Sequence, residues 1–421
     1  MGVGRMVGIP ETLRFLNAPQ NRRADLRPHV VVGITHPQTC LNLTGRLSAL
    51  REAGFRVTLV SSPGEWLDRT ATREGVDATA IPMRRRIAPL EDMVSLIRLY
   101  RLLRRLQPDL AEFSTPKAGL LGVLAAWLSD VPVRVYMLRG LKLERCVGLK
   151  RRILLAMEWL TAACAHVVLC NSGSLRDEAR GLGVAPAAKL FMLGDGSTNG
   201  VNVERFAPGE SSVRCELGIS AQAPVVGFVG RLTRDKGIPE LIEAFDRMLK
   251  TVPEARLLLV GWFDASDDAL CSSLRARIER HRRIHCTGFV SDTAPYYRAM
   301  DLMILPSWRE GFPNVVLEAA ATGIPVITTM ATGSRDSVVP EITGLLVPPG
   351  QPEALSTAAL KLLHDPEKRR KMGETARAWV VERYRQERVL GLVTGYYTRL
   401  VRRATGELHA SPIRALEAGQ D

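Results

Sequence analysis

Hydrophobic and polar positions alternate along this chain in a repeating rhythm of short and long segments. The short runs are rich in valine, leucine and isoleucine and are apolar at nearly every position. Continuous apolar runs of this kind predict strands that are buried on both faces, as in parallel sheets. The predicted strands are residues 29–35, 55–61, 109–113, 133–138 and 166–170 in the first half, and 224–230, 256–261, 283–289, 301–306 and 325–329 in the second.

Longer segments with a helical period, such as 42–53 and 90–106, lie between these runs. Parallel strands need long crossover connections, which are usually helices. The rhythm occurs twice, and 421 residues exceed the size at which a single hydrophobic core stops growing. The pattern therefore predicts an α/β protein with two Rossmann-like, doubly wound domains, in which ligands bind beyond the carboxyl ends of the strands.

The boundary between the two domains is predicted near residue 205. Residues 194–209 contain four glycines and one proline without a clear period. No helix directly follows these glycines, so a linker is favoured over a phosphate-binding loop. The predicted organisation is a loose tail (1–28), a first domain (29–205), a second domain (206–376), a C-terminal helix that packs back on the first domain (377–402) and a loose tail (403–421).

The amino-acid composition indicates the class of protein and its cellular compartment. Hydrophobic residues make up 46% and charged residues 24%, which is typical of a globular protein. The seven cysteines form no CxxC pair, which favours free thiols in a reducing compartment. The longest apolar stretch, 153–170, contains Glu158 and His166 and is interpreted as a helix followed by a strand. No apolar leader is seen at the N-terminus, so we expect a cytoplasmic protein.

The formal net charge of +13 is concentrated in the first half. Residues 1–205 hold 29 lysines and arginines against 18 acidic residues, and residues 84–152 hold 15 against 6. Arg98, Arg101 and Arg105 fall on one helical face with leucines alongside, a pattern typical of segments that lie on anionic membranes. Leucines in the core and arginines in solvent would give the same pattern in a single helix. The asymmetry between the halves favours an anionic membrane surface, at the inner face of the membrane.

Two cations follow the first strand of the second half. That strand ends at Gly230, which allows a ligand to approach the backbone closely, and Arg231 and Lys236 come next. An arginine and a lysine across a turn can converge on a diphosphate. A solvated basic turn is the alternative, and an isolated pair would favour it.

A second group of polar residues follows the predicted strand 301–306. Pro313 is predicted in the first turn of a helix, and the amides around Gly311–Asn314 would form an anion-binding helix N-terminus. Glu310, just before this helix, could accept hydrogen bonds from sugar hydroxyls. Glu318 lies further along the helix and suits a ribose diol. Taken singly, Glu310 could equally be a helix cap, and Glu318 could equally lie on a solvated helix face.

Together these residues resemble the retaining family-4 glycosyltransferases of the GT-B fold, in which two Rossmann-like domains face each other across a cleft. Glu310 and Glu318 enclose seven residues, as in the E-x7-E pattern of that family. Similar motifs in the second half are GRLTRDKG (230–237), EGFPNVVLEAAATGIPVITT (310–329), GSRDSV (333–338) and TGLLVPPGQPEAL (343–355). In the first half TPKAGLLG (115–122), LRGLKLE (138–144) and GSTNGVNVERF (196–206) resemble members that build bacterial surface glycans.

The resemblance implies a role for each residue of the second half. Arg231 and Lys236 would bind the donor diphosphate, Glu310 would meet the donor sugar and Glu318 would hold the ribose. The base would lie against the loop after Val290. The implied catalytic residues are Glu310, Arg231 and Lys236, and the implied donor-binding residues are Gly230, Arg231, Lys236, Val290, Glu310, Gly311, Phe312, Pro313, Asn314 and Glu318.

The resemblance also implies the reaction. A hexose or N-acetylhexosamine would move with retention from a nucleotide-diphosphate sugar, UDP-linked in similar members, to a glycan acceptor on undecaprenyl diphosphate. Such enzymes need no metal and no cofactor beyond the sugar nucleotide. The acidic residues 264–268 are accordingly interpreted as a surface loop.

The acceptor side departs from the family pattern. Many relatives place a histidine directly after the strand that corresponds to residues 109–113, and this chain has none there. Thr115 or Lys117 is the candidate for that place, and Arg139 is a further acceptor-side candidate. His36 follows the first strand and is another acceptor-side candidate. A purely structural role would suit this position equally well.

Other functions were weighed against glycosyl transfer. A nucleotide-sugar-modifying enzyme such as an epimerase would share the fold, but the E-x7-E region and the basic first half fit it less well. A nucleic-acid-binding protein would suit the pI of about 9.8. Only 5% of residues are aromatic and no such motif is present, so no nucleic acid is expected. A scaffold without activity is disfavoured because Arg231, Lys236 and both glutamates are intact.

Overall fold

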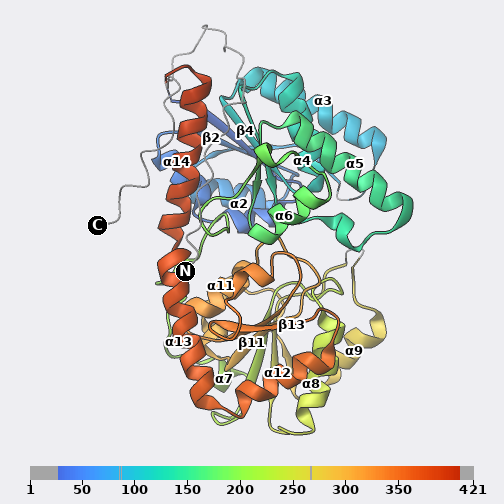
Figure 1. Ribbon diagram of the computed structural model, residues 1–421, viewed down its shortest axis with the longest axis vertical. Coiled ribbons are helices and arrows are strands. Elements are labelled where there is room, and N and C mark those ends of the chain that lie inside the picture. Colours follow the sequence, from blue (N-terminus) through green and yellow to red (C-terminus); the bar gives the residue numbers. More distant parts are fainter. Residues whose placement is uncertain (1–26, 85, 87, 266–267, 408–421) are drawn as a thin grey trace. The chain divides into compact units, whose positions relative to one another are not determined.

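The chain folds into two α/β units, shown in a computed structural model that describes residues 27–84, 86, 88–265 and 268–407 (Figure 1). The first unit contains the chain up to Asn199 and from Val389 onward, and the second unit is Gly200–Arg388. Each unit contains a single sheet in which all the paired strands run parallel. The predicted class of two parallel-sheet α/β domains is confirmed.

The first unit has a seven-stranded sheet with the order β3-β2-β1-β4-β5-β6-β7. Its strands are β1 (His29–Gly33), β2 (Arg56–Ser61), β3 (Asp77–Ala80), β4 (Leu110–Ser114), β5 (Val133–Leu138), β6 (Val167–Cys170) and β7 (Leu190–Phe191). Its helices are α1 (Arg46–Glu52), α2 (Glu65–Glu74), α3 (Pro89–Leu106), α4 (Pro116–Leu128), α5 (Gly148–Cys164) and α6 (Gly173–Gly181), with the short 3-10 helix η1 (Pro37–Leu43) after β1.

Helices cover both faces of this sheet, because its central strands are apolar on both sides (Figure 1). All five residues of β1 are buried. On one face Val31 packs with Phe113, whose ring lies so close to Gly33 and Gly122 that a side chain at either glycine would overlap with it. On the other face Val30 packs in a separate apolar cluster. Two cores therefore hold the sheet between two helical layers.

The second unit repeats this architecture with six strands in the order β10-β9-β8-β11-β12-β13. Its strands are β8 (Val225–Val229), β9 (Arg256–Val260), β10 (Ile284–Cys286), β11 (Leu302–Leu305), β12 (Val326–Thr329) and β13 (Gly344–Val347). Its helices are α7 (Val213–Glu216), α8 (Ile238–Leu249), α9 (Ser272–Arg280), α10 (Ala294–Arg298), α11 (Asn314–Ala321), α12 (Pro352–Leu363) and α13 (Pro366–Arg383).

All ten strands predicted from the sequence are present, and three further strands were missed. The missed strands, β3, β7 and β13, all lie at sheet edges. β3 is largely exposed and β7 has only two residues, so neither carries a long apolar run. An edge strand has one neighbour and needs less apolar surface, which explains why the pattern did not reveal β3 and β7. β13 is short but mostly buried, and its apolar run GLLV was overlooked.

The chain passes between the units at Asn199–Gly200 and at Arg388–Val389, which differs from the boundary expected after residue 205. The single helix expected over 377–402 is two helices, α13 and α14 (Gln386–Ala404). The break between them pairs with the linker, because the Val201 amide donates to the Tyr384 carbonyl at 2.8 Å and the Gln386 amide donates to the Val201 carbonyl at 2.9 Å.

The apolar stripe that suggested one helix is divided between two cores. Val380 and Tyr384 belong to the core of the second unit. Val393 and Tyr397 on α14 pack in the core of the first. The tails expected over 1–28 and 403–421 lie for the most part outside the described residues. Across the part of the chain that is described, no helix is long and apolar enough to cross a membrane.

Candidate functional site

The carboxyl edge of the second sheet gathers most of the residues that the sequence assigned to the donor. β8 pairs in parallel with both β9 and β11, so the three strands end at the same edge. Gly230 follows β8 with a φ of 145°, a conformation that favours glycine. A side chain at Gly261, directly after β9, would overlap with the Gly230 carbonyl. Because both residues are glycines, the ends of β8 and β9 can approach closely. Arg231 comes directly after Gly230.

Lys236 and Glu310 form an ion pair at this edge. The Lys236 Nζ lies 2.5 Å from the Glu310 Oε1, and the Ser307 hydroxyl donates to the same oxygen at 2.7 Å. The two side chains are 19% and 13% exposed, so the pair is accessible at its rim. The Glu310 amide donates to the Thr332 carbonyl at 2.9 Å, which ties the loop after β11 to the loop after β12. Glu310 is therefore held by both its backbone and its side chain.

Arg231 is held by acidic residues that the sequence did not assign. Its Nη1 lies 2.5 Å from the Asp264 Oδ2, and its Nη2 lies 3.9 Å from the Asp235 Oδ2. Arg309 also approaches Asp235, at 3.5 Å. The interpretation of residues 264–268 as a surface loop is thus wrong for Asp264, which belongs to the edge that carries Arg231. Residues 266 and 267 lie outside the described residues.

Asp235 is the buried centre of this group of charges. Burial alone would raise its pKa, but a hydrogen bond from the Thr233 hydroxyl at 2.5 Å and the charges of Lys236, Arg231 and Arg309 bring the pKa below its usual value. The carboxylate therefore stays ionised and holds two guanidinium groups at the end of β8. An ionised carboxylate in this place keeps the arginines oriented when no ligand is bound.

Glu318 occupies a different setting on α11. The buried Tyr297 on α10 donates its hydroxyl to the Glu318 Oε2 at 2.7 Å. Burial raises the pKa of Glu318 above its usual value, and the hydrogen bond from Tyr297 offsets part of that rise. Glu318 makes none of the described contacts with Arg231 or Lys236. The structure thus joins Lys236 to Glu310 and joins Glu318 to Tyr297.

The start of α11 differs by one residue from the expectation. Pro313 is the capping residue before the helix, with an extended ψ of 100°, and Asn314 is the first helical residue. The prediction of Pro313 in the first turn is therefore wrong by one position. Phe312 is buried and packs against Tyr384 with ring centroids 5.4 Å apart. Val290 is partly buried beside the core of the second unit.

The acceptor-side candidates follow strands β1, β4 and β5, which are neighbours in the first sheet. Thr115 has a φ of 71°, unusual for a residue with a side chain, and its Oγ1 lies 2.6 Å from the Thr35 Oγ1. His36 caps η1, where its Nδ1 accepts a hydrogen bond from the Gln38 amide at 3.3 Å. Lys117 is buried and pairs with Asp92 at 2.5 Å. The roles of these residues toward an acceptor stay predictions.

Arg139, the fourth acceptor-side candidate, lies beside a fully buried ion pair. Its Nη1 donates to the Thr198 Oγ1 at 3.2 Å. Arg46 on α1 pairs with Glu112 on β4 at 2.6 Å, and the Tyr397 hydroxyl on α14 donates to the same Glu112 oxygen at 2.6 Å. Burial and the charge of Arg46 lower the pKa of Arg139 to about 10. This network could not be predicted from the sequence, because its members are spread from residue 46 to residue 397.

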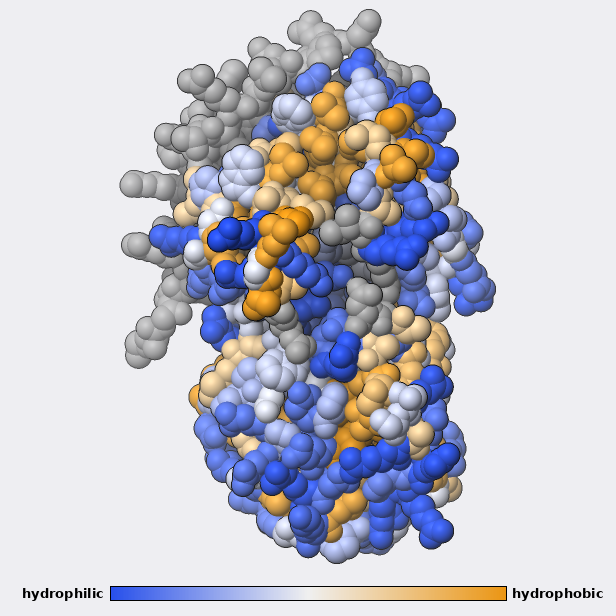
Figure 2. Space-filling model, turned by 90° about the vertical axis from the view of Figure 1, so that its right-hand side faces the viewer, coloured by the Kyte–Doolittle hydropathy of each residue, from blue (hydrophilic) through white to orange (hydrophobic). Residues whose placement is uncertain are grey.

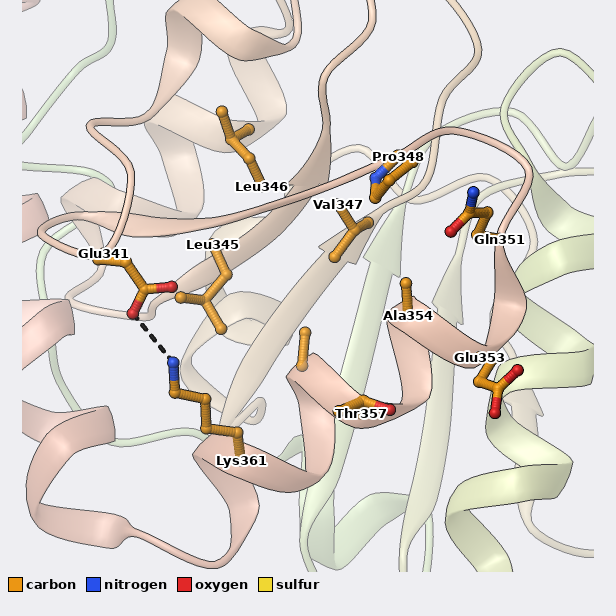
Figure 3. Close-up of a pocket in the computed structure, with 11 residues that line it drawn as sticks. Glu341, Leu345, Leu346, Val347, Pro348, Gln351, Glu353, Ala354, Thr357 and Lys361 are labelled. Carbon is orange, nitrogen blue, oxygen red and sulfur yellow. Dashed lines mark hydrogen bonds and ion pairs between the residues drawn. The ribbon is translucent and has the colours of Figure 1, made fainter.

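A separate pocket of the second unit lies between β13 and α12 (Figure 3). Leu345 and Val347 line it, and Glu341 and Lys361 form an ion pair of 3.0 Å at its rim. None of the predicted donor-binding residues lines this pocket. Within the described ranges, no group of three or more histidine, cysteine or acidic side chains is arranged to hold a metal ion.

The edge formed by Arg231, Lys236, Glu310 and Glu318 has the chemistry of a sugar-nucleotide site. A guanidinium and an ammonium can neutralise phosphate oxygens. Carboxylates can accept hydrogen bonds from sugar and ribose hydroxyls. Both kinds of group lie in the segments that follow the neighbouring strands β8 and β11, at the usual ligand-binding edge of such a fold.

Comparisons with known proteins agree with this chemistry. Residues 212–379 match the family "Glycosyl transferases group 1", and residues 45–196 match the "Glycosyl transferase 4-like domain". The chain is 31% identical over 366 residues to the capsular polysaccharide biosynthesis glycosyltransferase CapM of Staphylococcus aureus, an alignment that covers 87% of this chain and 95% of CapM.

Two further proteins extend the comparison. An Escherichia coli enzyme named UDP-Gal:alpha-D-GlcNAc-diphosphoundecaprenol alpha-1,3-galactosyltransferase is 28% identical over 67% of this chain and 73% of its own length. The crystal structure of Anabaena HepE in complex with UDP superposes with a TM-score of 0.71 at 20% identity, covering 88% of this chain and 99% of HepE, which shows the shared fold. The chain therefore belongs to the family-4 glycosyltransferases of the GT-B fold.

Proposed function

We propose that this glycosyltransferase moves a hexose or an N-acetylhexosamine, with retention of configuration, from a UDP-linked donor to a lipid-linked glycan during synthesis of a surface polysaccharide. The observation that carries this proposal is the placement of Arg231, Lys236 and Glu310 at the carboxyl edge of the second sheet, with Glu318 on the following helix. Cations for the diphosphate and carboxylates for hydroxyl groups are supplied by one unit.

The proposed reaction is a displacement on one face of the sugar. The bond between the anomeric carbon and the diphosphate oxygen breaks, and the acceptor oxygen bonds to the same face of that carbon. The acceptor hydroxyl gives its proton to the leaving diphosphate. Arg231 and Lys236 stabilise the negative charge that develops on the leaving group, and Glu310 holds the sugar hydroxyls. These two cations carry the charge stabilisation, so the reaction needs no metal ion.

The donor and acceptor classes draw support from the similar proteins. HepE binds UDP in its crystal structure. The Escherichia coli relative is named for a UDP-galactose donor and a diphosphoundecaprenol-linked acceptor, and CapM is named for capsular polysaccharide. The UDP-linked donor is thus supported by HepE and the Escherichia coli enzyme, the lipid-linked acceptor by the Escherichia coli enzyme, and the polysaccharide product by CapM.

An apolar and basic surface of the first unit supports a membrane-bound acceptor. Exposed apolar side chains gather on α3, on the end of α4 and around α5, and Figure 2 views the molecule from that side. The exposed residues are Leu90, Met93, Val94, Ile97, Tyr100, Trp127, Leu128, Val147, Leu149, Ile153, Trp159 and Leu160. Lys150, Arg151 and Arg152 stand among them on α5. We propose that this lipid-facing surface rests on the anionic inner face of the membrane.

The donor can be identified with a panel of nucleotide sugars. A ligand that binds the folded enzyme raises its melting temperature, so the true donor should stabilise the protein in the presence of EDTA. That donor is then incubated with undecaprenyl-diphosphate-linked saccharides, and the anomeric configuration of the product is read by NMR. An inverted product contradicts retention, and a UDP-sugar panel without any stabilisation contradicts the donor class.

The membrane contact is tested separately. Vesicles that contain phosphatidylglycerol should sediment the protein at low salt, whereas phosphatidylcholine vesicles should not. High salt should release it, because screening weakens the contact between arginines and lipid phosphates. Equal recovery with both kinds of vesicle contradicts the proposed role of the lipid-facing surface.

A further inference from the structure

A tyrosine that no sequence motif singled out lies against the glutamate proposed to hold the ribose. Tyr297 comes from α10, the short helix that precedes β11, whereas Glu318 comes from α11, which follows it. We propose that Tyr297 is a positioning residue that orients the Glu318 carboxylate toward the ribose hydroxyls of the donor. This inference rests on the proposed function and adds a determinant of nucleotide affinity to it.

The geometry commits one oxygen of the carboxylate and leaves the other for the ligand. The Tyr297 hydroxyl donates to the Glu318 Oε2 at 2.7 Å. A carboxylate on a two-bond stem turns readily about its last torsion, and a fixed donor on one oxygen removes that freedom. When Tyr297 holds Oε2, Oε1 has a fixed orientation in which it can accept hydrogen bonds. Orientation that is set before binding does not have to be gained during binding, which strengthens the complex.

Tyr297 is itself held firmly. Its side chain is fully buried, and the Phe206 ring meets it edge to face with centroids 5.8 Å apart and an interplanar angle of 77°. Arg298, the next residue, donates to the Ala207 carbonyl at 2.9 Å, so α10 is tied to the segment that carries Phe206. A hydroxyl on a ring packed in this way has little freedom to leave Glu318.

Electrostatic interactions keep the Tyr297 phenol protonated and favour the ionised form of Glu318. Burial and the charge of Glu318 raise the pKa of Tyr297 well above its usual value, so the phenol remains a donor at any physiological pH. Burial also raises the pKa of Glu318, and the hydrogen bond from Tyr297 lowers it. Tyr297 thus favours the ionised carboxylate, the form that accepts hydrogen bonds from both ribose hydroxyls.

The test compares two nucleotides on two variants by titration calorimetry. Tyr297→Phe removes the hydroxyl and keeps the ring, so the protein should still fold, with a melting temperature lowered by the loss of one buried hydrogen bond. We expect UDP to bind about tenfold more weakly to Tyr297→Phe, because Glu318 then has to be oriented when the ligand binds, at a cost of about 1.4 kcal/mol. Binding of 2′,3′-dideoxy-UDP should be equal in the two proteins, because this ligand lacks the hydroxyls. Tyr296→Phe, a half-buried neighbour on the same helix, serves as the matched control.

A second readout is the dependence of UDP affinity on pH. Affinity should fall as Glu318 becomes protonated, and in Tyr297→Phe the fall should begin at a higher pH because the carboxylate has lost a donor. Unchanged UDP affinity in Tyr297→Phe, or an equal loss for UDP and its dideoxy analogue, overturns the inference. Wild-type protein that binds no UDP instead overturns the proposed function, so the two failures are distinct.

Discussion

One ion pair in each unit shows that the two units use charge in opposite ways. In the second unit the pair between Lys236 and Glu310 remains partly exposed, so an incoming ligand can share or replace either partner. In the first unit the pair between Arg46 and Glu112 is completely buried, with no exposed side-chain surface on either residue. A buried pair cannot be opened without a large desolvation cost. The pair in the second unit is therefore accessible to the substrate that we propose, whereas the pair in the first unit is enclosed in the fold.

Removal of the buried carboxylate should have the largest effect. Glu112→Ala leaves Arg46 buried without its anion and deprives the Tyr397 hydroxyl of its acceptor. We expect a loss of about 3–5 kcal/mol in the free energy of unfolding of the first unit, measured by urea denaturation. Glu65→Ala removes an exposed pair with Arg69 and should cost less than about 0.5 kcal/mol. Similar costs for the two variants would break the comparison.

The partly exposed pair should behave in the reverse way. Lys236→Ala removes a cation proposed to stabilise the leaving diphosphate, so kcat should fall by about 10²–10³. Because this pair keeps some contact with solvent, the melting temperature should fall less in Lys236→Ala than in Glu112→Ala. Lys250→Ala, at the exposed end of α8, is the control and should keep full activity. A variant at Lys236 that unfolds readily but turns over normally would reverse the roles assigned to the two ion pairs.

Another buried carboxyl group, that of Glu158, should make the stability of the first unit depend on pH. Glu158 on α5 accepts a hydrogen bond from Tyr136 at 2.7 Å, and burial raises its pKa from 4.5 to about 7. The folded state therefore binds this proton more tightly than the unfolded state. The resulting stability is fully present below pH 4.5 and is lost as the pH rises through 7, up to about 3 kcal/mol.

Glu158→Gln should remove this pH dependence, because an amide does not titrate. Unfolding free energies of the two proteins are compared at pH 5 and pH 8, with the wild type losing more stability between them. Equal slopes for wild type and variant would mean that Glu158 does not titrate in this range. The loss should appear in the first unit, where Glu158 and Tyr136 both lie.

The fold was predictable to the extent that strands are buried on both faces. β5, for example, was predicted at its observed bounds, because an apolar run between polar residues is a local signal. The break between α13 and α14 was not predictable. Its cause is a pairing of Tyr384 and Gln386 with Val201, far away in the chain, and the helical period continues across it.

In the candidate site, too, some residues could be placed from the sequence and others could not. Lys236 and Glu310 follow strand ends and carry family motifs, so their place at one edge could be predicted. Asp264 and Tyr297 precede or follow strands without a distinctive spacing, and only the tertiary fold brings them to Arg231 and Glu318. The sequence thus reveals the groups that we propose to act on the substrate more readily than the groups that hold them in place.

The smallest expected effect concerns the surface of the first unit that we propose faces lipid. Ile153 on α5 is 45% exposed, and Ile342 in the second unit is 55% exposed, so the two isoleucines differ in place rather than in solvent contact. If α5 lies against lipid, Ile153→Ser should weaken binding to phosphatidylglycerol vesicles about fivefold, since partial burial of one aliphatic side chain is worth about 1 kcal/mol. Ile342→Ser should leave vesicle binding unchanged. Equal losses would mean that apolar exposure alone, and not its position among the basic residues of α5, draws the protein to the membrane.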